Sequence, residues 1–164
     1  MAKITFRGGD DFGRRLERLN TANSRNIIMR AVKKGTGLVA DAIRKNLNSI
    51  PARRNIHLAK GEMLDGLQER EKKDLLESLG ITPIQADKKG FVHAKVGFDG
   101  YGSTPTKKYP EGTPNQLVAA SVESGSSIRN KHPFIRPAVN KTKAEAIRVM
   151  DESINADIQQ IFEE

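Results

Sequence analysis

The chain has 164 residues, of which 37% are hydrophobic and 29% charged, and its formal net charge is +8, which together suit one polar globular domain. Cysteine is absent, which excludes disulfides, thiolate nucleophiles and cysteine-based zinc sites. No segment approaches the roughly 20 apolar residues of a membrane helix or the apolar core of a secretion signal, so we expect a cytoplasm-like compartment and no membrane contact.

The first expected elements are a short edge strand at residues 4–6 and a short helix that begins after Asp10 or Asp11. A longer helix is expected between Ser24 and Pro51, because apolar residues recur there with a period of about 3.6 residues. Two glycines at positions 35 and 37 interrupt this helix. They permit either a kink or a close contact with another helix, and the sequence leaves both open.

Residues 52–70 are highly charged and only weakly periodic, so we expect a variable loop with one helical turn near 62–67. A short helix at 71–79 should end at Gly80. Two strands are expected at 81–86 and 91–98, joined by a hairpin turn.

Further along the chain, a Gly- and Pro-rich surface loop is expected at 99–114, and a helix at 116–123 that Gly125 closes. A last helix should start near Pro137 and run to about Phe162. These elements predict a single α+β domain over residues 1–164, in which long N- and C-terminal helices pack on a small, mainly antiparallel sheet.

Candidate catalytic or metal-binding residues are few. His57, His93 and His132 lie more than thirty residues apart and show no metal-ligand spacing. Asp10 and Asp11 stand beside glycines, but a turn with a capping aspartate explains them more simply than a metal site. Because phosphate-binding glycine motifs are also absent, we expect no catalytic residue, no metal and no cofactor, and a protein that is not an enzyme.

The basic residues are unevenly distributed. Nine lie between residues 25 and 60, with Asp41 as the single acid, whereas the last fourteen residues carry five acids and no Lys or Arg. Such asymmetry favours contact with nucleic acid or charge-complementary contact between copies, although a solvated helix face is an equally simple reading. The residues expected at such a DNA or subunit contact are Arg25, Arg30, Lys33, Lys34, Arg44, Lys45, Arg53 and Arg54.

Aromatic residues are scarce, with no Trp, two Tyr and six Phe. This leaves few surfaces on which the bases of a single strand could stack. No helix-turn-helix, zinc-finger or RNA-binding sheet motif accompanies the basic segment, so any DNA contact should be independent of sequence.

Two short runs in the C-terminal third form a recognisable motif: Glu123-Ser124-Gly125-Ser126, and Pro133-Phe134-Ile135-Arg136-Pro137-Ala138 at the start of the last helix. This motif resembles the tail-completion, or head–tail joining (neck), proteins of lambda-like long-tailed bacteriophages and prophages. The segment 74–79 ahead of the hairpin is similar to the lead-in of that family. Ser124 departs from the family, where an aromatic residue is common, and residues 52–70 look like an insertion.

The resemblance implies a structural protein of virion assembly, located in the virion at the head–tail junction or proximal tail end and in the host cytoplasm during assembly. It implies a ring oligomer around the DNA channel, with other neck or tail proteins as partners. The residues with an architectural role would be Glu123, Gly125, Pro133, Phe134, Arg136 and Pro137. The alternative from another class is a non-specific DNA-binding protein of a mobile element.

Overall fold

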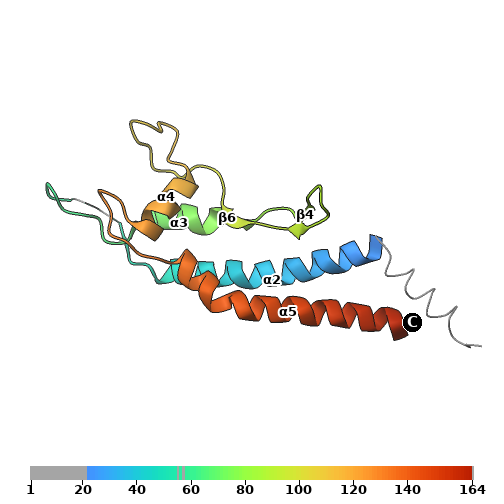
Figure 1. The fold of residues 1–164 in the computed structure, drawn as a ribbon. Coiled ribbons are helices and arrows are strands. Elements are labelled where there is room, and N and C mark those ends of the chain that lie inside the picture. Colours follow the sequence, from blue (N-terminus) through green and yellow to red (C-terminus); the bar gives the residue numbers. More distant parts are fainter. Residues whose placement is uncertain (1–21, 55, 57, 164) are drawn as a thin grey trace, which may run out of the picture.

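The computed structural model describes residues 22–54, 56 and 58–163. The strand expected at 4–6 and the helix expected after Asp10 or Asp11 lie outside these residues. The described helices are α2 (Ala22–Ser49), α3 (Glu69–Ser78), α4 (Asn115–Ser124) and α5 (Ile135–Glu163) (Figure 1). The described strands are β1 (Ala52–Arg53), β2 (Leu67–Gln68), β3 (Leu79–Ile81), β4 (Gln85–Ala86), β5 (Val92–His93) and β6 (Val96–Phe98).

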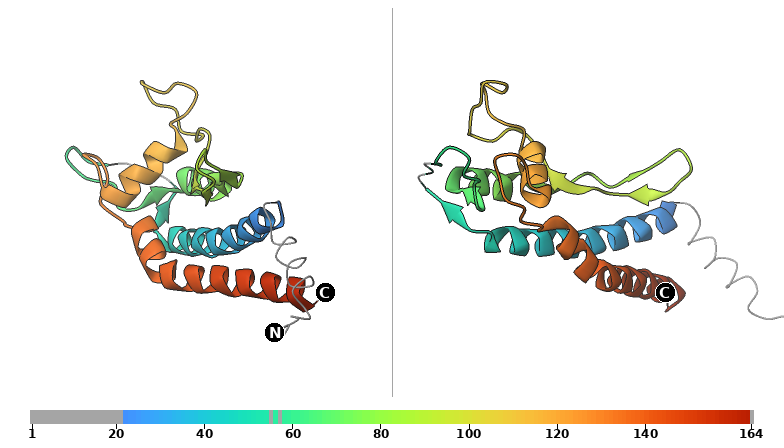
Figure 2. Two further views of the ribbon diagram at one scale, coloured as in Figure 1. Left: turned by 45° about the vertical axis from the view of Figure 1, so that its right-hand side comes forward. Right: turned by 60° about the vertical axis from the view of Figure 1, so that its left-hand side comes forward.

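The two long helices, α2 and α5, run antiparallel along one side of the molecule and pack against each other over most of their length (Figures 1 and 2). The short helices α3 and α4 and the strands lie on the other side of α2. The expected α+β fold, with long N- and C-terminal helices and small antiparallel sheets, is confirmed.

The strands form three separate two-stranded pairs. β3 pairs antiparallel with β6, β4 pairs antiparallel with β5, and β1 pairs in parallel with β2. Both expected strands, 81–86 and 91–98, are therefore divided in two. Between the pairs, the Thr82 side-chain oxygen accepts the Lys95 N–H (2.9 Å), and Pro83 has no N–H to donate to a ladder.

The hairpin turn between the divided strands is confirmed. The Asp87 N–H donates to the Phe91 carbonyl (3.0 Å), and Gly90 adopts a φ of 84°, which favours glycine. Along 91–98 the burial alternates as in a strand: the even-numbered residues are at least partly buried, while the odd-numbered ones are exposed.

The helical turn expected near residues 62–67 is wrong. The backbone of this segment bonds to distant parts of the chain instead: the Leu64 N–H donates to the Ile128 carbonyl (2.8 Å) and the Leu67 N–H to the Pro51 carbonyl (2.9 Å). Gly66 has a φ of 88°, and a Cβ there would overlap the Pro51 carbonyl oxygen. Both leucines are buried, so tertiary contacts determine this conformation.

The main core lies at one end of the helix pair. It joins the last turns of α2, represented by Leu47, to α3 through Leu75, to α4 through Val122 and to the start of α5 through Phe134. The rings of Phe134 and Phe98 meet edge to face with centroids 5.9 Å apart. Beyond this core, the rest of α5 packs mainly on α2.

The contact between α2 and α5 decides the role of the two helix glycines. A Cβ at position 35 would overlap the Met150 side chain, so Gly35 permits close approach of the helices, whereas a Cβ at position 37 would meet nothing. Ala146 and Ser153 of α5 are buried, whereas the apolar Ile147 of the same helix is 49% exposed.

Candidate functional site

The predicted basic contact residues do not form one cluster. On α2, Arg30, Lys33, Lys34, Arg44 and Lys45 fall within about one third of the helix circumference, given 100° per residue. We call these five residues the basic face of α2. A helix of 28 residues is about 42 Å long, so the basic face extends along roughly half of that length.

Ion pairs within the chain already use part of this face. Arg30 Nε lies 3.1 Å from Asp157 Oδ2 of α5, and Arg44 Nη1 lies 2.9 Å from Asp41 Oδ1. Among the described residues, no ion-pair partner is found for Lys33, Lys34 or Lys45, and all three are exposed. These lysines remain available to an external anion.

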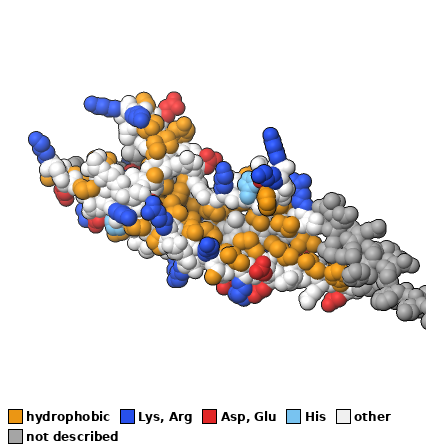
Figure 3. Space-filling model, viewed as in Figure 1, with side chains coloured by type: hydrophobic (Ala, Val, Ile, Leu, Met, Phe, Trp, Pro, Cys, Tyr) orange, Lys and Arg blue, Asp and Glu red, His pale blue; other side chains and the backbone are white. Residues whose placement is uncertain are grey.

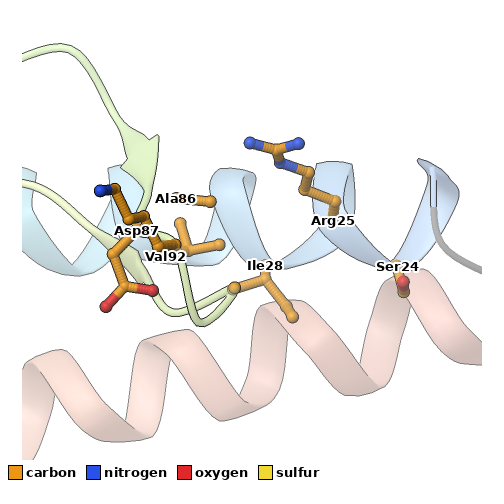
Figure 4. A pocket seen from close by; sticks show the side chains of 8 residues that line it. Ser24, Arg25, Ile28, Ala86, Asp87 and Val92 are labelled. Carbon is orange, nitrogen blue, oxygen red and sulfur yellow. The ribbon is translucent and has the colours of Figure 1, made fainter.

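The other predicted basic residues lie elsewhere. Arg25 faces the β4–β5 hairpin and lines a pocket with Lys88 and Val92 (Figure 4). Arg53 is in β1 and Arg54 follows it, at the opposite end of α2, where Arg54 Nε lies 3.1 Å from Glu69 Oε2. The structure thus separates the predicted basic segment into three locations.

The two runs of the sequence motif meet at the start of α5. Glu123, near the end of α4, is 6% exposed, and its carboxylate accepts three backbone N–H groups: Phe134 (2.7 Å), Ile135 (2.8 Å) and Arg136 (3.0 Å). The first N–H groups of a helix have no partner within it. Glu123 therefore caps α5 from a different helix, and its negative charge lies at the positive end of the helix dipole.

The direction in which the pKa of Glu123 is shifted agrees with this capping geometry. Burial acts to raise the pKa of Glu123, but the three backbone donors and the nearby Arg136 outweigh it and hold the pKa below its ordinary value. Arg136 Nε lies 3.8 Å from the Glu123 carboxylate, and its side chain is 70% exposed. Arg136 is thus also accessible to a neighbouring molecule.

The remaining motif residues shape the chain between α4 and α5. Gly125 ends α4 with a φ of 79°, a conformation in which an L-residue is strained. Pro133 precedes the buried Phe134. Pro137 occupies the first turn of α5, where its missing N–H leaves no intrahelical bond unmade.

Sequence reasoning missed a buried ion pair beside this motif. Arg129 Nη2 lies 2.8 Å from both carboxylate oxygens of Glu71, and Arg129 Nη1 donates to the Gly66 carbonyl (3.3 Å). His132 Nε2 also lies 2.7 Å from Asp65 Oδ1. The loop 125–134 is therefore attached to α3 and to the loop before β2, and only the position of Arg129 between the two halves of the motif signals this in the sequence.

Exposed apolar side chains lie on the same side of the molecule as this loop. Leu58, Leu117 and Ile128 are 39%, 47% and 66% exposed and line a groove of about 440 Å³, with Leu64 and Val118 at its buried base. Polar side chains, including Gln68, Thr104 and Ser127, also line this groove.

Neither a metal-binding cluster nor a membrane-spanning helix is present among the described residues. No group of three His, Asp or Glu side chains in this part of the chain could hold a metal ion. None of the described helices combines the length and the apolar character that crossing a membrane requires. Comparison of the chain with known protein families, with curated proteins and with solved structures found no match.

Proposed function

We propose that this chain is a structural subunit of virion assembly, acting at the head–tail junction or proximal tail end of a long-tailed bacteriophage. The observation that supports this most is the contact between Glu123 and the start of α5. The motif that resembles neck proteins is two runs in the sequence but one connected unit in space, with a carboxylate, a helix terminus and a core phenylalanine.

The surface supports docking of macromolecules. Lysines that have no ion-pair partner among the described residues lie along α2, an apolar groove lies beside the loop 125–134, and Arg136 is exposed next to the motif. Because these features are different from one another, two copies would associate head to tail, and such contacts close into rings when the rotation permits. In this arrangement the basic face of α2 faces either the DNA channel or the acidic surface of the next subunit.

Deletion of the coding gene from the phage or prophage genome that carries it tests this proposal. We expect lysates that contain DNA-filled heads and separate tails in the electron microscope, with joined particles restored by the wild-type gene. Infectious particles in undiminished number would contradict an assembly role. Light scattering on the purified protein, alone and with the products of adjacent genes, should detect a mass above that of the monomer.

A second candidate function, a non-specific DNA-binding protein of a mobile element, is favoured by Lys33, Lys34 and Lys45 of α2, which are exposed and have no ion-pair partner in the described part of the chain. In that case Lys33→Glu, Lys34→Glu and Lys45→Glu together should weaken binding to any duplex and reduce its dependence on salt, because fewer counterions are released. A mobility-shift assay at several salt concentrations measures this. Duplex binding that the triple variant leaves unchanged would exclude this function for the basic face of α2.

A further inference from the structure

The β4–β5 hairpin carries a site that neither function uses. Its turn lies over the first turns of α2, and a pocket of about 400 Å³ separates the two. Arg25 of α2 and Lys88 of the turn both line this pocket, and Val92 and Ile28 face each other across it (Figure 4). We call Arg25, Lys88, Lys89 and Phe91 the hairpin site.

Phe91 is placed outward rather than in the core. It is 69% exposed, whereas its neighbour Val92 is half-buried toward α2, as alternation along a strand requires. His93, on the same outer face, is also exposed. An exposed phenylalanine contributes nothing to the core. The exposed Lys88, Lys89 and His93 lie within three residues of Phe91 in the chain.

Hydrogen bonds hold the hairpin turn in place, and its two lysines, Lys88 and Lys89, are exposed to a ligand. The Oδ1 atom of Asp87 accepts the backbone N–H groups of Lys89 (2.8 Å) and Phe91 (2.9 Å), which fixes the turn. Within the described part of the chain, Arg25, Lys88 and Lys89 have no ion-pair partner, and all three are exposed. Figure 3 shows basic side chains projecting from this hairpin.

We propose that the hairpin site binds single-stranded nucleic acid. Lysine and arginine attract the phosphates, and the exposed ring of Phe91 on the same hairpin offers a face on which one base can stack. A protein interface would surround its aromatic anchor with further apolar residues that exclude water, whereas the exposed residues nearest to Phe91 in the chain are Lys89, Gly90 and His93.

This inference goes beyond the assembly role and does not depend on it, because a protein outside virions would bind a single strand through the same side chains. The chain contains no tryptophan, so Phe91→Trp creates a single fluorescent reporter in the site itself. We expect a short oligothymidylate to quench this tryptophan, a matched duplex to quench it far less, and Phe91→Ala to weaken oligothymidylate binding by roughly 5- to 150-fold.

Charge reversal supplies the matched comparison. Lys88→Glu with Lys89→Glu should reduce the salt slope of oligothymidylate binding by about 1.4, since each phosphate contact on a single strand accounts for about 0.7. The control is Lys141→Glu with Lys143→Glu, two exposed residues of α5 that make the same change in total charge and should leave binding nearly unchanged.

Three results would overturn the proposal. The first is no binding of oligothymidylate at low salt, and the second is equal loss in the two charge-reversed variants, which would indicate only a general effect of net charge. The third is a tryptophan signal that responds equally to single strand, duplex and anionic vesicles. The gene deletion measures virion assembly, whereas this titration measures binding at one hairpin of the purified protein. A negative result in one experiment therefore leaves the result of the other interpretable.

Discussion

At the scale of single residues, Glu123 connects the sequence motif to stability. Replacement by Ala removes the carboxylate and leaves three backbone N–H groups at the start of α5 without their partner. We expect a loss of about 3 kcal/mol in the free energy of unfolding, since hydrogen bonds to charged groups contribute about 1.5–3 kcal/mol, and urea denaturation measures it. As a control, Glu77→Ala on α3 loses only an exposed i,i+4 pair with Lys73 and should cost about 0.5 kcal/mol or less.

The lowered pKa of Glu123 also predicts a dependence of stability on pH. A carboxyl group whose pKa is lower in the folded state binds its proton more readily after unfolding, so its contribution is complete above the ordinary value of 4.5 and is lost as pH falls through the folded pKa. Asp65, held by His132, acts in the same direction. We expect the wild type to lose stability below pH 4.5 more steeply than Glu123→Gln, and parallel curves would contradict the assignment.

At the scale of the element, the two glycines of α2 make opposite predictions. Gly37→Ala should stabilise the protein by about 0.5–1 kcal/mol, because alanine favours the helix and its Cβ meets no neighbouring atom. Gly35→Ala gains the same helix propensity, but its Cβ would overlap the Met150 side chain. This variant should therefore stabilise the protein less, or destabilise it. Thermal unfolding of both variants checks this order. A larger gain at position 35 would show that the two helices are not closely packed there.

Elements whose signals are local were predictable from the sequence. Helical periodicity predicted α2, Pro137 predicted the first turn of α5, and the residues between the two expected strands, which include Asp87 and Gly90, predicted the hairpin turn. The parallel pair β1–β2 was not predictable, because Leu64 and Leu67 are positioned by backbone bonds to Ile128 and Pro51. The same limit applies to the functional surface: charge counts located the basic segment, but only the fold separates Arg25 from the basic face of α2.

At the scale of the whole molecule, the uneven position of the core predicts uneven local stability. The buried cluster that includes Leu47, Val122 and Phe134 joins four helices at one end, while the far half of α5 rests mainly on α2. Hydrogen exchange should therefore be slowest in the last turns of α2, in α4 and in the first turns of α5. The start of α2 and the end of α5 should exchange faster, by local opening that does not require global unfolding. Docking of a partner on the helix pair would slow exchange at that end, and uniform protection along both helices in the free protein would contradict this division.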